Sequence, residues 1–256
     1  MIALAAAAHP DDIEFMMAGT LLRLKDSGCE IHLWNLANGC CGSATLSRGA
    51  AAALRWEEAQ ASANLAGGTA HPPLFDDLSI FYDAPSVALA AAVIRRIQPD
   101  IILTQSPQDY MEDHQNTTRL VVTGAFTRAM KNFASQPDMS VCNKPVALYH
   151  SLPHGLNDAL RQPVLPHFFV DIGPVLDRKR AMLACHASQK EWLDATQGMD
   201  AYLDEMENMS RAVGRMSGKH EFAEGWRRHS HLGFGPEDFD PVSDFLHPSS
   251  SPNPQP

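Results

Sequence analysis

A short uninterrupted apolar run, Ile2 to Ala8, leads directly into the polar sequence His9-Pro10-Asp11-Asp12. An apolar run of this length is typical of a strand buried on both faces, as strands of a parallel sheet are. Pro10 suits the first turn of a helix, where its missing N–H costs nothing, and the two aspartates suit the positive end of the helix dipole. We therefore predict a strand, a tight turn and a helix, in this order.

The same alternation of apolar runs with helical patterns continues along the chain. It indicates an α/β fold with a mostly parallel, Rossmann-like sheet and helices on both of its faces. Ligands of such sheets bind at the carboxyl ends of the strands. The predicted strands are residues 2–8, 30–37, 100–104, 146–150 and 168–172, and the predicted helices are residues 13–24, 50–66, 87–97, 113–130, 175–187 and 191–211.

Length and composition indicate one sizeable domain. The chain has 256 residues, 45% of them hydrophobic, and we predict a single domain over 1–247 with a disordered Pro/Ser-rich tail over 248–256. A net charge of −10 disfavours binding to nucleic acid. We find no apolar run of about 20 residues, no signal-peptide pattern and no Cys-x-x-Cys pair among five cysteines. We therefore expect a cytoplasmic protein with reduced thiols and no membrane contact; a homo-oligomer is left open.

The sequence His9-Pro10-Asp11-Asp12 could bind a metal ion. Residues three apart on a helical turn share a face, so His9 and Asp12 can converge on one ion while Asp11 points elsewhere and is free to accept a proton. Taken alone, the tetrapeptide is explained equally well as a helix cap with acidic residues at the positive end of the dipole.

A second cluster, Asp109 to His114, follows the strand that ends at Thr104. Alone it is best explained as a solvated acidic loop, but the predicted sheet brings both clusters to one edge. His9, Asp12 and His114 then make a set of two imidazoles and one carboxylate, which suits zinc and leaves its fourth position for water. Oxygen-only sites would favour magnesium or calcium, so we predict zinc or a neighbouring divalent transition metal.

These motifs resemble the LmbE/PIG-L-like family of zinc-dependent N-deacetylases. The resemblance starts with AHPDDIEF at residues 8–15 and continues with the Arg-x-x-Glu helix at Arg55 to Glu58. It resumes with QPDIILTQSPQDYMEDH at residues 98–114 and ends near CHASQ at residues 185–189. It implies a Rossmann-like fold and N-acetylated, sugar-containing substrates, often N-acetylglucosamine derivatives.

The resemblance also implies roles for single residues. His9, Asp12 and His114 match the metal ligands, Asp11 matches the general base, and Asp113 matches an acidic residue that supports the ligands from behind. We further predict that Arg55 contacts the substrate. The alternative for Arg55 is a salt bridge with Glu58 on the helix surface, worth only a few tenths of a kcal/mol.

One position departs from the family pattern. The last motif often reads His-Pro-Asp-His, whereas this chain has Met111-Glu112-Asp113-His114. A thioether cannot donate a hydrogen bond to a tetrahedral oxyanion. Either zinc alone polarises the carbonyl or another donor substitutes, and we favour a C-terminal histidine. The candidate donors are Arg55, Tyr110, His186, His220, His229 and His231.

Three functions remain. The first is metal-dependent removal of an N-acyl group from a sugar-containing substrate. The second keeps the zinc but cleaves another bond, as in an esterase or other hydrolase. The third is a non-catalytic zinc- or ligand-binding protein, which the intact Asp11 disfavours. No G-x-G-x-x-G follows the first strand and no Gly-x-Ser-x-Gly elbow occurs, which disfavours dinucleotide enzymes and serine hydrolases.

Overall fold

The protein is described by a computed structural model that covers residues 1–189 and 201–246. Its strands are β1 (Ile2–Ala7), β2 (Glu30–Asn35), β3 (Thr69–His71), β4 (Ile101–Thr104), β5 (Ala147–Ser151), β6 (Phe168–Asp171) and β7 (Ala223–Arg228). They form a seven-stranded sheet in the order β3-β2-β1-β4-β5-β7-β6. The first five strands in this order are parallel, whereas β7 is antiparallel to both β5 and β6. The predicted α/β fold with a mostly parallel sheet is confirmed.

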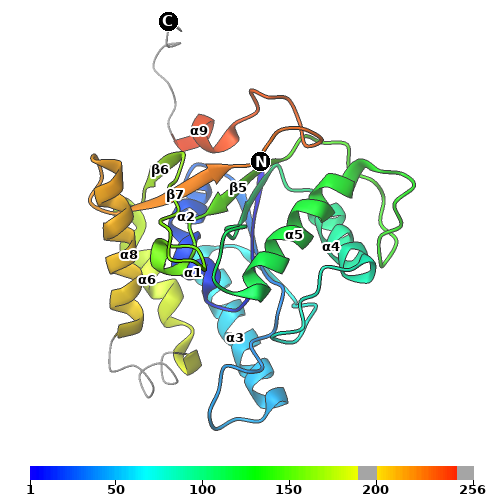
Figure 1. Ribbon diagram of the computed structural model, residues 1–256. Coiled ribbons are helices and arrows are strands. Elements are labelled where there is room, and N and C mark those ends of the chain that lie inside the picture. Colours follow the sequence, from blue (N-terminus) through cyan, green and yellow to red (C-terminus); the bar gives the residue numbers. More distant parts are fainter. Residues whose placement is uncertain (190–200, 247–256) are drawn as a thin grey trace, which may run out of the picture.

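Helices lie on both faces of the sheet (Figure 1). α4 (Ala84–Ile97) and α5 (Glu112–Phe126) cover one face, and α2 (Ala18–Asp26), α3 (Arg48–Ala66) and α6 (Leu176–Ala184) pack on the other. The remaining helices are α1 (Asp12–Met16), α8 (Ala201–Ser217) and α9 (Pro241–Leu246), with 3-10 turns at Thr127–Ala129, His154–Leu156 and Gly173–Val175.

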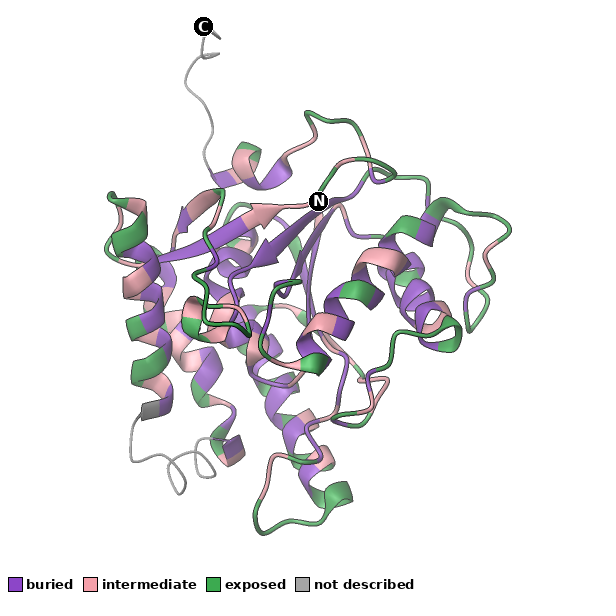
Figure 2. Ribbon diagram, in the orientation of Figure 1, coloured by how far each residue is buried: buried purple, intermediate pink, exposed green. Residues whose placement is uncertain are grey.

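The central strand β1 is apolar throughout because both of its faces are covered. Successive side chains of a strand point to opposite faces, so β1 contributes to two cores, and Figure 2 shows the strands buried between the helices. Ala3, Ala5 and Ala7 pack with α2, whereas Leu4, Ala6 and the following Ala8 pack with α4 and α5.

Several elements differ from the prediction. The helix expected over 13–24 is broken at Met17, whose φ of −134° interrupts it between α1 and α2. β3 has only three residues, too few for a period-two signal. β7 was missed because its sequence, AEGWRR, is charged. Its Glu224 is nevertheless buried, because it accepts hydrogen bonds from the backbone of Gly19 and Thr20 and from Lys179.

Two predictions concern residues outside the described ranges. α8 covers the second part of the helix expected over 191–211, and residues 190–200 are outside the description. The tail predicted over 248–256 also lies outside it, so the domain boundary stays a prediction. None of the helices in the described part of the chain combines the length and apolar character needed to cross a bilayer.

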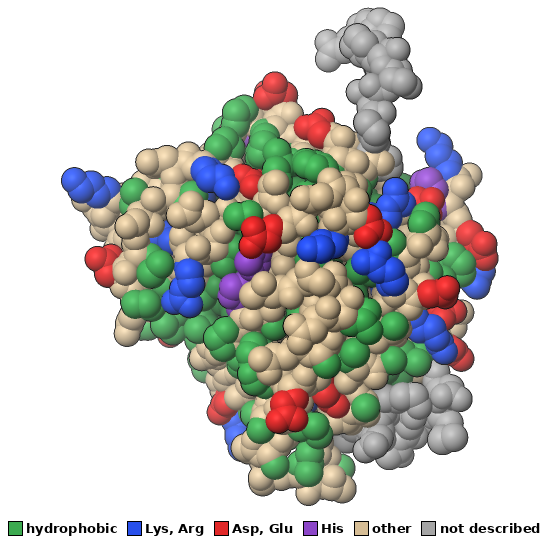
Figure 3. All heavy atoms as spheres, turned by 180° about the vertical axis from the view of Figure 1, so that it is seen from behind, with side chains coloured by type: hydrophobic (Ala, Val, Ile, Leu, Met, Phe, Trp, Pro, Cys, Tyr) green, Lys and Arg blue, Asp and Glu red, His purple; other side chains and the backbone are tan. Residues whose placement is uncertain are grey.

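On the face seen in Figure 3, acidic and basic side chains are interspersed. All five cysteines are free.

Candidate functional site

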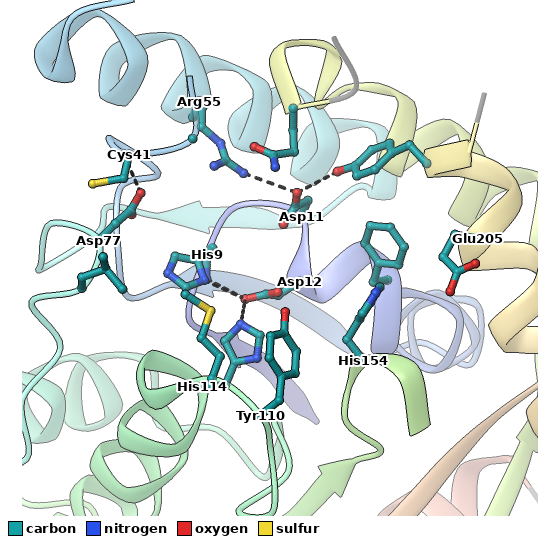
Figure 4. Close-up of a pocket in the computed structure, with 16 residues that line it drawn as sticks. His9, Asp11, Asp12, Cys41, Arg55, Asp77, Tyr110, His114, His154 and Glu205 are labelled. Atoms are coloured by element: carbon teal, nitrogen blue, oxygen red, sulfur yellow. Dashed lines mark hydrogen bonds and ion pairs between the residues drawn. The ribbon is translucent and has the colours of Figure 1, made fainter. Parts of the chain in front are cut away.

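The two clusters of acidic residues and histidines meet at the carboxyl ends of β1 and β4. These strands are neighbours in the sheet, with Ala6 beside Thr104. His9 follows β1, while the loop after β4 leads into α5, whose first turn carries Asp113 and His114. One ligand atom from each of His9, Asp12 and His114 lies within 4.8 Å of the others. The predicted convergence of these residues is therefore seen in the structure (Figure 4).

One carboxylate oxygen of Asp12 is the common partner of both histidines. Asp12 Oδ2 lies 3.5 Å from Nδ1 of His9 and 3.4 Å from Nε2 of His114. The same oxygen accepts a hydrogen bond of 2.7 Å from the backbone N–H of His9. This last bond closes the turn and fixes the carboxylate toward the two rings.

Each histidine ring is held from behind by a second carboxylate. Nε2 of His9 lies 3.0 Å from Asp113 Oδ2, and Nδ1 of His114 lies 3.0 Å from Asp109 Oδ1. Metal-binding histidines commonly have such a partner on the second ring nitrogen, which fixes the tautomer and the ring orientation. The nitrogens that face Asp12 are thereby left for an ion.

The aspartate that precedes His114 in the sequence supports the other histidine of the cluster. Asp113 contacts His9 rather than His114, and the corresponding partner of His114 is Asp109. Sequence reasoning did not single out Asp109, although this aspartate also follows β4 closely. Asp113 additionally accepts a 2.7 Å hydrogen bond from the backbone of Leu78, which ties the loop after β3 to the site.

The electrostatics of the cluster suit a cation at its centre. Burial alone would lower the pKa of His9, but its hydrogen bonds to Asp113 and Asp12 raise it to about 10. Burial also opposes ionisation of Asp12, yet the charge of His114 and the hydrogen bonds of His9 hold its pKa well below the usual range. Two imidazoles thus retain protons around an ionised carboxylate. A divalent ion can replace those protons, so the donor set fits a metal.

Asp11 points away from Asp12, as predicted from their adjacency. Its φ of 99° is in the left-handed region, which a non-glycine residue occupies at a cost of about 1–3 kcal/mol. Its Oδ2 accepts a 2.8 Å hydrogen bond from the hydroxyl of Tyr202 and lies 3.4 Å from Nη2 of Arg55. Burial raises the pKa of this carboxyl, against the opposing charge of Arg55. Tyr202, on α8, was missed by sequence reasoning.

Arg55 is buried beside Asp11 and does not form the surface salt bridge considered above. Its Nη2 donates to the backbone carbonyl of Pro10, whereas Glu58 accepts hydrogen bonds from the backbone and hydroxyl of Ser188. Two loop glycines make room for the arginine. A Cβ on Gly39 would lie 2.5 Å from Cδ of Arg55, and one on Gly42 would collide with its Nη1. Its role as a substrate contact stays a prediction.

The cluster opens into a pocket of about 710 Å³ (Figure 4). This volume is in the range of small-molecule sites. Besides the residues above, Phe15, Leu78, Tyr110, Met111, His154 and Glu205 contribute to its walls.

None of the C-terminal histidines expected to replace a histidine at position 111, which are His220, His229 and His231, is among the described residues that line the pocket. The ring of His229, which follows β7, bonds the ring of His150 on β5, and neither ring is among the described residues that line the pocket. His220 lies near Asp171, at the end of the outermost strand β6. The expectation is therefore corrected: the pocket wall contains His154 instead, together with the predicted candidates Tyr110 and Arg55. His186 is fully buried beside Glu14.

Residues 4–125, which include both clusters, match the family model described as PIG-L: GlcNAc-PI de-N-acetylase. These residues therefore match the PIG-L family domain. The resemblance inferred from the motifs is confirmed.

Proteins similar to this chain include deacetylases, which are hydrolases. Diacetylchitobiose deacetylase from Thermococcus kodakarensis is 28% identical over 223 residues, which are 86% of this chain and 79% of that protein. The structure of N,N'-diacetylchitobiose deacetylase from Pyrococcus horikoshii has the same fold. It superposes with a TM-score of 0.75 at 22% identity, over 94% of this chain and 88% of that one.

A relative with a different reaction also matches. 4-Oxalmesaconate hydratase from Pseudomonas putida is 25% identical over 196 residues, which are 73% of this chain and 74% of that protein. Family membership alone therefore does not choose between hydrolysis and hydration, and the choice depends on the pocket.

Proposed function

We propose that this chain is a zinc-dependent amidohydrolase that removes an N-acetyl group from an amino sugar, such as an N-acetylglucosamine derivative. The family match and the diacetylchitobiose deacetylase relative support the reaction class. We further propose that it acts in the cytoplasm.

One observation carries this proposal. In both His9 and His114, one ring nitrogen is hydrogen-bonded to a supporting aspartate and the other ring nitrogen faces Asp12. The adjacent Asp11 is held outside this cluster by Tyr202. Two imidazoles and one carboxylate are a ligand set of catalytic zinc sites, and a nearby carboxylate that binds no metal can act as a base.

Each residue of the site has its own role in the proposed reaction. A zinc ion held by His9, Asp12 and His114 would polarise the amide carbonyl and lower the pKa of a water molecule. Asp11 takes the proton of the water whose oxygen attacks the carbonyl carbon. Tyr202 orients the Asp11 carboxylate, which its buried position makes more basic than an exposed one.

The reaction ends with cleavage of the C–N bond. The proton held by Asp11 moves to the departing nitrogen, so that acetate and the sugar amine are released. Donors on the opposite wall, among them His154 and Tyr110, are placed to hydrogen-bond the oxygen on which negative charge develops.

Pocket charge favours this reaction over the hydration of a carboxylate. Of the described residues that line the pocket, Arg55 is the only arginine or lysine, and it is engaged with Asp11 and Pro10. The acidic lining residues include Asp77 and Glu205. Such a lining repels an anionic substrate and attracts an amine product.

The zinc-loaded protein should release acetate from N,N'-diacetylchitobiose or N-acetylglucosamine, measured by a coupled acetate assay. An acetate ester and 4-oxalmesaconate, run in parallel, test the esterase and hydratase alternatives. Turnover of either compound without acetate release from an N-acetyl sugar would contradict the proposal. Zinc bound with no turnover of any compound would support the non-catalytic alternative.

A further inference from the structure

A second group of metal-binding side chains lies on the pocket wall, separate from the histidine cluster. Cys40 and Cys41 lie in the loop after β2, and Asp77 lies in the loop after β3. One ligand atom from each lies within 4.8 Å of the others. Cys41 and Asp77 also line the pocket (Figure 4). This group shares no residue with His9, Asp12 and His114.

The two thiols are spaced as two ligands of one ion would be. Their sulfur atoms are 3.9 Å apart. Two thiolates at the usual zinc–sulfur distance of about 2.3 Å in tetrahedral geometry lie about 3.8 Å apart. The cysteines therefore need little movement to bind a single tetrahedral ion.

Asp77 fixes the loop that carries the cysteines. Its Oδ1 accepts a 2.7 Å hydrogen bond from the backbone of Gly39, and its Oδ2 accepts one of 2.7 Å from the backbone of Cys41. Both oxygens keep a lone pair, because a carboxylate oxygen can accept more than one bond. The carboxylate and the thiols are thus held together before any ion arrives.

A guanidinium and a carboxylate lie beside the loop of the two cysteines. Nη1 of Arg48 lies 3.6 Å from Sγ of Cys41, while its Nη2 forms a 2.7 Å ion pair with Asp76. Asp76 offsets the positive charge of Arg48, which would otherwise repel a cation. Burial raises the pKa of the Cys40 thiol, so ion uptake must displace thiol protons into solution.

We propose that Cys40, Cys41 and Asp77 form a second metal site, which takes a thiophilic divalent ion such as Cd²⁺ or excess Zn²⁺ on the wall of the pocket. Two thiols release two protons as two metal–sulfur bonds form, so affinity falls as pH falls. An ion here narrows the entrance to the histidine cluster and therefore inhibits turnover. The inhibition rests on the proposed function, whereas the binding does not.

Cd²⁺ titration of the full chain, kept reduced with a phosphine, tests the binding. The wild-type protein should bind about two equivalents and develop the ultraviolet thiolate-to-metal charge-transfer band, which histidine and carboxylate ligands do not produce. The double variant Cys40→Ser/Cys41→Ser should bind about one equivalent without the band. Cys185→Ser, which alters a thiol outside the site, should behave as wild type. His114→Ala should lose the other equivalent and keep the band.

Two further outcomes complete the test. The single variant Cys41→Ser changes an exposed side chain and serves if the double variant does not fold; it should weaken the band strongly. A band of wild-type strength in Cys41→Ser, or no band in the wild type, would overturn the proposal. Inhibition by excess Zn²⁺, expressed relative to each protein's own uninhibited rate, should also disappear in Cys41→Ser. A protein that releases no acetate would contradict the proposed function and the inhibition, while the Cd²⁺ titration would still decide whether the second metal site exists.

Discussion

The hydroxyl of Tyr202 donates a 2.8 Å hydrogen bond to Oδ2 of Asp11, although the two residues are 191 positions apart in the chain. Tyr202 lies on α8, outside the residues 4–125 that match the PIG-L family model. The residue proposed as general base is therefore oriented by a side chain from the other half of the protein.

Replacing Tyr202 by phenylalanine should lower kcat without loss of zinc. A hydrogen bond to a charged group is worth about 1.5–3 kcal/mol, so we expect kcat to fall roughly 10- to 100-fold. Tyr82→Phe, which removes an exposed hydroxyl bonded to Thr123, is the matched control. Steady-state kinetics with metal analysis checks this. Equal kcat in the Tyr202→Phe and Tyr82→Phe proteins would show that Tyr202 does not orient the base.

Asp11→Asn should keep the fold and the zinc but lose most turnover. Asparagine tolerates the left-handed backbone that position 11 requires, and its amide can still meet Tyr202. It cannot accept the proton from water, which should reduce kcat roughly 10²- to 10⁴-fold. Single-turnover acetate release by the zinc-loaded variant measures this. An undiminished rate would remove Asp11 from the reaction.

Asp113→Asn should weaken metal binding rather than chemistry. Asp113 fixes the ring of His9, and loss of such a partner typically weakens metal affinity roughly 10- to 100-fold. Asp109→Asn should act likewise through His114. Competition with a zinc chelator measures the affinity. Asp26→Asn breaks an exposed ion pair with Arg178 and should leave affinity unchanged, so an equal effect there would exclude a specific role.

Met111→His tests whether the oxyanion donor is already supplied. If His154 fills this role, the new histidine should raise kcat by less than roughly tenfold, while His154→Ala should lower it roughly 10²- to 10³-fold. The kcat values of both variants on one N-acetyl sugar decide the matter. A larger gain in Met111→His, with a normal rate for His154→Ala, would show that the position has no substitute.

His150 should make the protein less stable as pH falls from 7 to 5. Nδ1 of His150 donates to the carbonyl of Gln105, and Nε2 accepts from Nδ1 of His229. Burial lowers the pKa of His150 from 6.5 to about 4. The unfolded chain therefore binds a proton between these values that the folded chain does not, and stability falls as pH drops through this window.

The contribution of His150 to this loss is about 2 kcal/mol between pH 7 and pH 5. Denaturant unfolding at both pH values measures it. His150→Asn, which retains a donor for the Gln105 carbonyl, should show a pH dependence that is smaller by this amount. The exposed His167→Asn should behave as wild type, and identical pH dependence in all three proteins would contradict the assignment.

The sequence alone determined the strand–turn–helix at residues 2–16 and the parallel arrangement of most strands. It also determined that His9 and Asp12 share a face while Asp11 does not. These features depend on local periodicity and on the spacing within one helical turn, which neighbouring residues already specify. Joining His114 to the pair needed only the rule that parallel strands end at a common edge.

Tertiary structure decided the contacts that no spacing specifies. Asp113 meets His9 instead of the adjacent His114 because the ring orientations depend on loops from β3 and β4. Contacts with His150 and Asp171 hold His229 and His220, and neither histidine is among the described residues that line the pocket. Tyr202 and Asp11 meet because α8 packs back against the start of the chain. Long-range packing of this kind leaves no periodic trace in the sequence, since each partner satisfies its own local pattern independently.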